Sequence, residues 1–319
     1  VDDKLLIDGW GKDKSADQAL DFHFEAGRTY KIRIEFVNDR RGARVIFGYS
    51  AGWENFPAAV EAARKADVAI LCMGDNEETS GENFDRTDLN LPGRQLELVQ
   101  AVYATGTPVV LVLQSGRPVT ANWENDHLPA ILEAWFPGEQ GGTAIAKTLF
   151  GDAAPGGRLP ITFPRSVGQI PCHYSRRPGG GKRYVEMDWL PLYPFGYGLT
   201  YTTFAYRDMA LSRSVIDPQD TVTVSVTVTN TGKYTGDAVP QLYVRDMFSS
   251  VVKPERQLAA FRRLTLAPGE SRRVELTVGP KQLRTLGPDY VWRVEPGKFE
   301  LQLGDNAENI LLRADLTVE

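Results

Sequence analysis

The sequence is poor in the residues that bind metals or build disulfide frameworks, with two cysteines and three histidines among 319 residues. Cys72 falls in an apolar run and Cys172 follows a proline, and neither has a cysteine or histidine at a metal-binding spacing. We therefore expect two free thiols, no metal and no cofactor. His127 and His173 have no serine or cysteine beside them in a recognisable nucleophile setting, so no catalytic triad is predicted.

Blocks of like charge and long hydrophobic runs are also missing. The net charge is −5, from 36 basic and 41 acidic residues. Without a basic stripe we expect no nucleic-acid partner, and without a long apolar run we expect no membrane span. The chain has neither an initiator methionine nor a signal-peptide pattern. Since it opens at Val1, we expect a processed, cleaved or truncated product of a longer precursor.

The first fifty residues alternate between apolar and polar side chains, with turns rich in glycine and aspartate between the alternating segments. Such period-two patterns predict β-strands. The segments that we expect to be strands are 5–7, 20–24, 29–36 and 43–47.

From Trp53 to about Thr203 the pattern changes to apolar strands that alternate with helices. The expected helices are 57–66, a segment from Pro92 to about Gly106, and 141–150, and the expected strands are 67–73, 109–113 and 130–135. This alternation predicts a flavodoxin-like α/β sandwich, in which helices cover both faces of a parallel sheet. The glycine pair that opens the third helix fits close packing or an anion site, and packing is favoured.

The remaining chain differs from this α/β region. A long segment of about 171–193 is rich in glycine and arginine, and a loop of that length indicates a functional or mobile element, or one that meets another domain. After Phe204 only strands are expected, at 221–229, 238–244, 272–278 and 297–303. Turn signals separate these strands, which predicts a β-sandwich.

One carboxylate stands out by its position. Glu82 lies in the polar segment Ser80–Arg86, directly after the expected strand 67–73. Open α/β sheets bind their ligands outside the carboxyl ends of the strands. Position alone also fits a solvated loop acid, and Glu77, Glu78 and Asp85 are nearby rivals. Asp85 followed by Arg86 indicates an ion pair that supports the loop.

Many motifs resemble, in order, the C-terminal half of family 3 glycoside hydrolases. They are the runs 82–95, 108–113, 115–118, 135–142, 150–152, 155–160 and 193–201, and the likeness extends over about residues 55–319. In addition, Asp8–Gly11 with Glu25–Tyr30 is similar to the end of a protective-antigen-like β module, and the final strands resemble a fibronectin type III-like domain. The resemblance implies three parts with limits at 1–52, 53–203 and 204–319.

The resemblance also implies a chemistry, in which Glu82 is the general acid/base of a retaining β-glucosidase. Retention needs two carboxylates about 5–5.5 Å apart. The family's nucleophile is an aspartate on a (β/α)8 barrel, and no such barrel is found in this sequence. The expected partners are therefore that barrel and a β-glucoside or β-gluco-oligosaccharide. The alternative is a carbohydrate-binding or interaction fragment without turnover, and co-purification with a barrel-bearing chain would separate the two.

Overall fold

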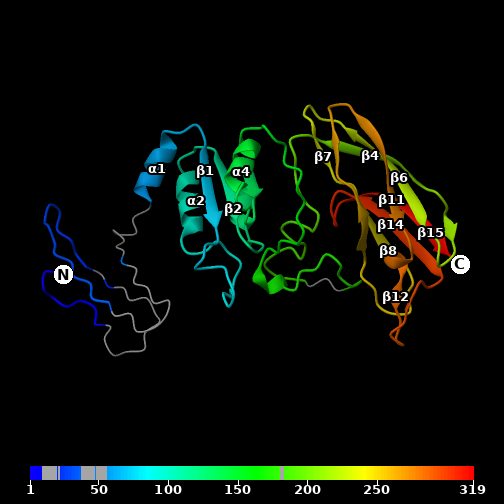
Figure 1. Cartoon of the computed structure of the whole chain (residues 1–319), viewed down its shortest axis with the longest axis horizontal. Coiled ribbons are helices and arrows are strands. Elements are labelled where there is room, and N and C mark those ends of the chain that lie inside the picture. Colours follow the sequence, from blue (N-terminus) through cyan, green and yellow to red (C-terminus); the bar gives the residue numbers. More distant parts are fainter. Residues whose placement is uncertain (9–19, 21, 37–46, 48–55, 180–182) are drawn as a thin grey trace. The chain divides into compact units, whose positions relative to one another are not determined.

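The computed structural model describes residues 1–8, 20, 22–36, 47, 56–179 and 183–319. The chain divides into two compact units, Val1–Glu54 and Asn55–Glu319 (Figure 1). The domain limit predicted near Trp53 lies outside the described residues. The predicted division into 1–52, 53–203 and 204–319 stays a prediction.

The described part of the first unit contains no helix and no strand. The predictions of strands over 5–7 and 29–36 are therefore wrong for this structure, as is the prediction over 20–24 for its described residues. The segment 43–47 lies, apart from Phe47, outside the described residues. The backbone of 29–36 is not paired in a ladder, although Lys31 exchanges hydrogen bonds of 2.8 Å with Asp2. A strand needs a continuous row of such bonds. Ile32 and Ile34 are exposed, so apolar burial does not hold the segment either. The protective-antigen-like assignment stays a prediction.

The second unit begins with an α/β region whose order confirms the predicted fold class. Its elements are α1 (Pro57–Arg64), β1 (Ala69–Gly74), α2 (Gln95–Tyr103), β2 (Val109–Gln114), α3 (Asn122–His127), β3 (Ala130–Glu133) and α4 (Gly141–Leu149). The three strands form a parallel sheet in the order β1-β2-β3, with Leu71 opposite Leu111 and Leu111 opposite Ile131. Helix α3 was not predicted. Among the helices of the described residues, none has the length and apolarity needed to cross a bilayer.

Helix α2 begins at Gln95 rather than near Pro92. Gly93 has a φ of 60°, which is outside the helical region and ends the turn before the helix starts. The Gln95 N–H reaches back to the Pro92 carbonyl at 3.4 Å. Val99 and Val102 of α2 are buried in the same hydrophobic core as Leu111 and Leu113 of β2. Each such side chain contributes about 1.5–3 kcal/mol when it leaves water.

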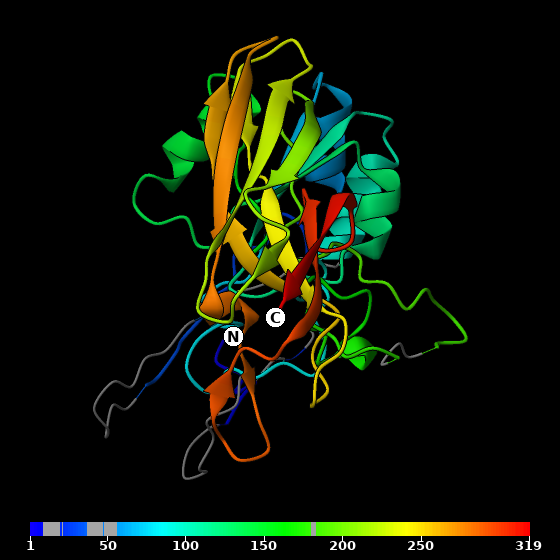
Figure 2. The same cartoon turned by 90° about the vertical axis from the view of Figure 1, so that its right-hand side faces the viewer.

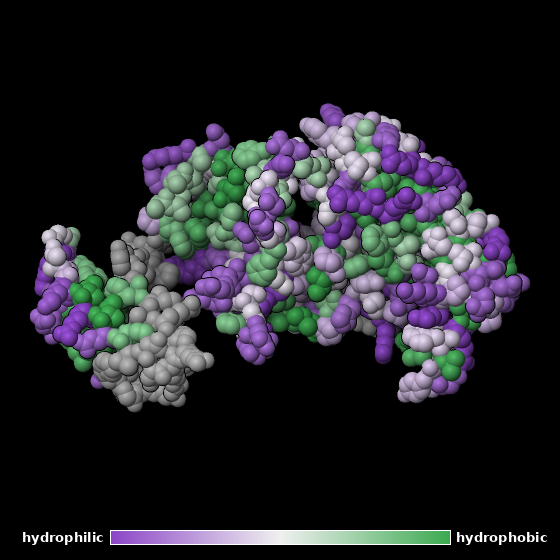
Figure 3. Space-filling model, in the orientation of Figure 1, coloured by the Kyte–Doolittle hydropathy of each residue, from purple (hydrophilic) through white to green (hydrophobic). Residues whose placement is uncertain are grey.

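Strand β1 is less buried than predicted. Leu71 and Met73 pack against the core of the α/β region, whereas Ile70 is 45% exposed and Cys72 is also exposed. The surface over β1 is correspondingly hydrophobic in Figure 3. Strand β1 lies at an edge of the sheet, and its alternate side chains point away from the core. The expectation that helices cover both faces of this strand is therefore wrong within the described residues.

A single-turn helix, η1 (Val167–Gln169), lies in the irregular segment that leads to the β-sandwich. The sandwich elements are β4 (Phe204–Leu211), β5 (Val215–Ile216), β6 (Val222–Asn230), β7 (Gly236–Ala238), β8 (Gln241–Asp246), β9 (Gln257–Phe261), β10 (Leu264–Leu266), β11 (Ser271–Val278), α5 (Pro280–Leu283), β12 (Thr285–Leu286), β13 (Trp292–Arg293), β14 (Gly297–Gly304) and β15 (Ile310–Val318).

The sandwich contains two main sheets, one of order β11-β6-β4 and one of order β5-β15-β14-β8-β9 (Figure 2). Val222, Val224, Val226 and Val228 of β6 are completely buried. Phe299 and Leu301 of β14 belong to the same hydrophobic core. The two sheets thus share one core, as the predicted β-sandwich requires.

Candidate active site

The loops that follow β1, β2 and β3 meet at the carboxyl edge of the parallel sheet. A Cβ added to Gly116, after β2, would lie 2.8 Å from the Phe136 ring, after β3, and 3.4 Å from the Ser80 hydroxyl, after β1. A side chain at position 116 would have to push the Phe136 ring aside. The edge where open α/β sheets bind ligands is therefore formed here by three short segments in contact.

Glu82 lies in a tight turn of the first of these loops. The Phe84 N–H donates to the Gly81 carbonyl at 3.2 Å, which closes the turn around Glu82 and Asn83. Asn83 has a φ of 66°, a conformation that asparagine adopts more readily than most residues. The Glu82 side chain is exposed and makes no hydrogen bond or ion pair within the described part of the chain. Its carboxylate is thus free to meet a group from outside.

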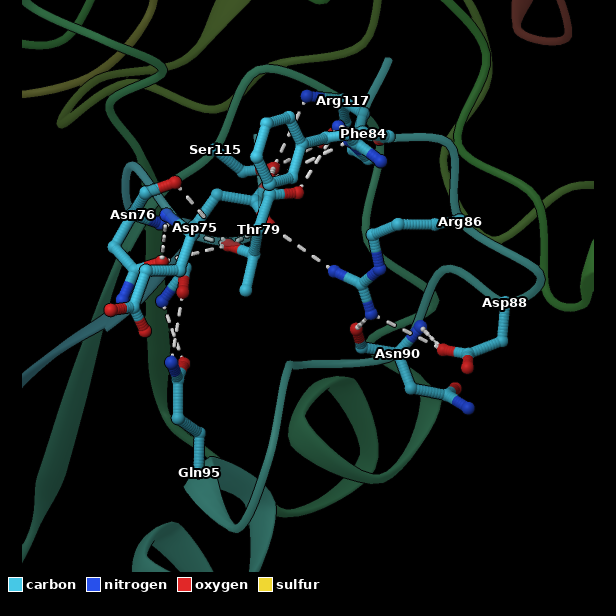
Figure 4. Close-up of polar contacts among 12 residues, drawn as sticks. Asp75, Asn76, Thr79, Phe84, Arg86, Asp88, Asn90, Gln95, Ser115 and Arg117 are labelled. Carbon is cyan, nitrogen blue, oxygen red and sulfur yellow. Dashed lines mark hydrogen bonds and ion pairs between the residues drawn. The ribbon is translucent and has the colours of Figure 1, made fainter. Parts of the chain in front are cut away.

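Arg86 supports the loop, although with other partners than predicted (Figure 4). Its guanidinium lies 3.2 Å from the Asp75 carboxylate and 3.3 Å from Asp88, and it donates to the Asn90 carbonyl at 2.6 Å. Asp85 is exposed and forms no ion pair within the described ranges. The predicted Asp85–Arg86 pair is therefore wrong. Arg86 pairs instead with Asp75, whose side chain is only 1% exposed, since a carboxylate held away from water needs a cation close by.

Glu77 and Glu78 lie at the start of the same loop and are exposed. The Glu78 N–H donates to the Asn76 side chain at 2.9 Å, and the Asn76 N–H donates to the Thr79 hydroxyl at 2.9 Å. These short-range bonds form a turn before Ser80. The two rival glutamates therefore belong to a different turn from Glu82.

Sequence reasoning missed Glu133, which ends β3 at the same edge of the sheet. Its Oε1 accepts a hydrogen bond of 2.9 Å from the Trp135 N–H, and its buried Oε2 has no partner among the described residues. Burial raises the pKa of this carboxyl to about 7. The signal in the sequence was an acid at the end of the apolar run Ala130–Leu132.

Packing, which the sequence favoured for the glycine pair at the start of α4, explains Gly141 alone, since Gly142 has open space around it. A Cβ on Gly141 would lie 2.4 Å from the Pro137 ring, so a side chain is excluded there. Trp123 packs against the hydrophobic core and stacks on His127 at 4.3 Å. Among the residues that the structure describes, no group of three or more His, Cys, Asp or Glu side chains fits a metal ion.

The long segment 171–193 contacts the β-sandwich through Arg176. Its guanidinium lies 3.2 Å from Glu255 and 2.7 Å from Glu308, and it stacks over the Trp189 ring at 4.5 Å. A small cavity of about 90 Å³ opens beside it, with Cys172 and His173 among its lining residues. Of the roles that the sequence left open for this segment, these contacts favour a meeting with the β-sandwich region.

Two parts of the chain each match a known protein family. Residues 8–201 match the family described as "Glycosyl hydrolase family 3 C-terminal domain", and residues 238–307 match "Fibronectin type III-like domain". A beta-xylosidase from Formosa agariphila is 45% identical over 302 residues, which are 91% of this chain and 42% of that protein. A periplasmic beta-glucosidase from Salmonella typhimurium is 42% identical over 263 residues, 79% of this chain and 34% of that protein.

Solved structures show the same likeness. A β-glucosidase from Erythrobacter marinus has a TM-score of 0.80 and 41% identity, over 82% of this chain and 36% of that one. The chain thus spans between a third and a half of the length of these relatives. The family matches agree with the sequence motifs and with the observed parallel sheet and β-sandwich. The chain belongs to glycosyl hydrolase family 3, as the C-terminal domain followed by a fibronectin type III-like domain.

Proposed function

We propose that this chain supplies the general acid/base of a retaining β-glycosidase that releases terminal, non-reducing β-D-glucosyl residues. Glu82 is that acid/base. The nucleophile is an aspartate on a (β/α)8 barrel outside the chain, and the same barrel forms most of the sugar pocket. The chain and the barrel are therefore partners in one enzyme, and no cofactor takes part.

The observation that carries the proposal is the setting of Glu82. Its carboxylate is exposed and unbound within the described residues, while the loop on either side of it is held by the partly buried Arg86 and Arg117. A carboxylate that only stabilised the fold would be expected to have a partner. A general acid must instead keep its oxygens available for the leaving group, and must be held within hydrogen-bond reach of it.

The chemistry follows from two carboxyl groups about 5–5.5 Å apart. In the first step, the nucleophile carboxylate attacks the anomeric carbon while protonated Glu82 donates its proton to the glycosidic oxygen, and the aglycone leaves as an alcohol. In the second step, ionised Glu82 removes a proton from water, which attacks the anomeric carbon and releases the sugar. Glu82 is then protonated again, so the cycle closes.

The names of the relatives support a β-linked sugar and leave two candidates for it. The Salmonella relative is named a β-glucosidase, which supports the glucosyl substrate, and the Formosa relative is named a β-xylosidase. A xylosyl residue lacks only the hydroxymethyl group of glucose. The second candidate function is therefore the release of terminal β-xylosyl residues by the same two steps.

The decisive experiment uses Glu82→Gln in the complete enzyme. General acid–base help contributes about 10²–10⁴-fold, so turnover of cellobiose should fall by that order. An aryl glucoside with a good leaving group needs little protonation, and its first step should be much less affected. Azide does not need a base, and it should restore turnover by forming a glycosyl azide.

Glu78→Gln and Glu77→Gln are the matched controls, because they remove a carboxylate from the same loop. They should cost far less and show no azide effect. If Glu78→Gln is rescued by azide and Glu82→Gln is not, Glu82 is not the acid/base. Parallel assays with aryl β-glucoside and aryl β-xyloside decide between the two sugars.

A further inference from the structure

We infer that Asp75 is a positioning residue, which holds the turn that carries Glu82 in place through Arg86 and Arg117. The inference rests on the proposed role of Glu82 and deepens it. Asp75 has no contact with that carboxylate among the described residues, so its effect is exerted through the loop backbone.

Asp75 lies at the centre of a polar cluster from three segments of the chain (Figure 4). Its side chain is 1% exposed. One carboxylate oxygen accepts from the Thr79 hydroxyl at 3.1 Å and from Arg86 at 3.2 Å. The other accepts from the Ser115 hydroxyl at 2.9 Å and lies 3.7 Å from Arg117 Nε. All of these partners flank the turn or belong to the loop after β2.

The arginine from the β2 loop reaches the backbone on both sides of Glu82. Arg117 Nη2 donates to the Thr79 carbonyl at 3.4 Å and lies 3.5 Å from the Phe84 carbonyl. Arg86 closes the other end of the loop by its bond to the Asn90 carbonyl. The two guanidiniums thus fix both ends of the Glu82 turn, and each of them pairs with Asp75.

The burial of these charges makes the arrangement depend on Asp75. The side chains of Arg86 and Arg117 are only 17% and 22% exposed. A charge held away from water needs an opposite charge close by. Replacing the carboxylate with a neutral amide of the same shape leaves two cations without their common partner, so they should turn toward solvent and release the loop carbonyls.

A released turn would displace the acid/base. Because Glu82 has no side-chain partner within the described residues, the backbone of the turn determines the point and the direction from which its side chain extends. A displacement of about 1 Å in a catalytic group costs about 100-fold in rate. The loss should appear where protonation by Glu82 limits the rate, and should be small where the leaving group departs unaided.

The test compares Asp75→Asn with a matched change, Asp237→Asn, in the complete enzyme. Asp237 is also a buried carboxylate that accepts from one threonine, Thr265 at 2.6 Å, and one arginine, Arg263, but it lies in the β-sandwich. For Asp75→Asn, kcat/KM on cellobiose should fall by about 10–100-fold and on an activated aryl glucoside by less than about 3-fold. Asp237→Asn should change both substrates by the same factor.

A second variant, Arg117→Met, removes the link to the loop carbonyls and leaves Asp75 in place, and it should give the same split between substrates. This variant decides the matter if Asp75→Asn does not fold. Equal losses on both substrates, in whichever variants fold, would overturn the inference and leave Asp75 a structural residue. Glu82→Gln is measured alongside: if it lacks the split and the azide rescue, the proposed function fails, whatever the Asp75 result.

Discussion

The side chain of Gln95 binds both backbone polar groups of Gly74. Its Oε1 accepts from the Gly74 N–H at 2.7 Å, and its Nε2 donates to the Gly74 carbonyl at 2.8 Å. Gly74 is the last residue of β1 and directly precedes Asp75. The first residue of α2 therefore holds the point where the chain leaves the sheet and enters the candidate site.

Gly74→Ala should destabilise the α/β region by at least about 2 kcal/mol, from backbone strain and overpacking together. Gly74 has a φ of 137°, and an added Cβ would lie 2.0 Å from the Gln114 carbonyl oxygen. Urea unfolding, with hydrogen exchange at the amides of β1 and β2, measures the loss. Gly93→Ala is the control, since Gly93 also has a positive φ of 60° but open space around it. An equal loss in both variants would show that the close approach is unimportant.

Glu133 should make the stability of the α/β region depend on pH. Its pKa is raised to about 7 by burial, from an ordinary value of 4.5. Between these values the unfolded chain loses the proton that the folded chain keeps, so stability falls as the pH rises through this window. Glu133→Gln removes this dependence. Relative to the native chain, the variant should gain up to about 3 kcal/mol between pH 4.5 and 7, as measured by urea unfolding at several pH values. A difference that stays constant with pH would contradict the assignment.

Cys72 should react with a thiol reagent well before Cys172 in the isolated chain. Cys72 is exposed on the outer face of β1, whereas burial raises the pKa of the Cys172 thiol and so lowers its reactive thiolate fraction. Time-resolved labelling with a maleimide, followed by peptide mass analysis, gives the order. The variant Cys72→Ser should lose the fast phase. Faster labelling of Cys172 would mean that its loop opens readily.

The chain alone should not hydrolyse an aryl β-glucoside. Retention needs a second carboxylate about 5–5.5 Å from the acid/base, and we propose that this carboxylate lies on a (β/α)8 barrel outside the chain. The complete enzyme, assayed beside the purified chain, is the positive control. Turnover by the pure chain that disappears in Glu82→Gln would refute the need for the barrel.

Hydrophobic periodicity in the sequence predicted most of the secondary structure of the second unit. The apolar run 109–113 and the alternating run 221–229 correspond to β2 (Val109–Gln114) and β6 (Val222–Asn230). These patterns are local, since a continuous apolar run indicates a strand buried on both faces and an alternating run indicates a strand buried on one face. The strand predicted over 29–36 failed because alternation alone does not provide a neighbouring strand.

Sequence by itself determined the class of the fold, the family and the choice of Glu82 as the candidate acid/base, because these depend on local patterns and ordered motifs. The partners of that site depended on the tertiary structure. Arg86 pairs with Asp75, 11 residues away, instead of with adjacent Asp85, and Ser115 reaches Asp75 across 40 residues. The parallel sheet brings its carboxyl ends together from distant parts of the chain, and only that convergence buries Asp75 between two arginines.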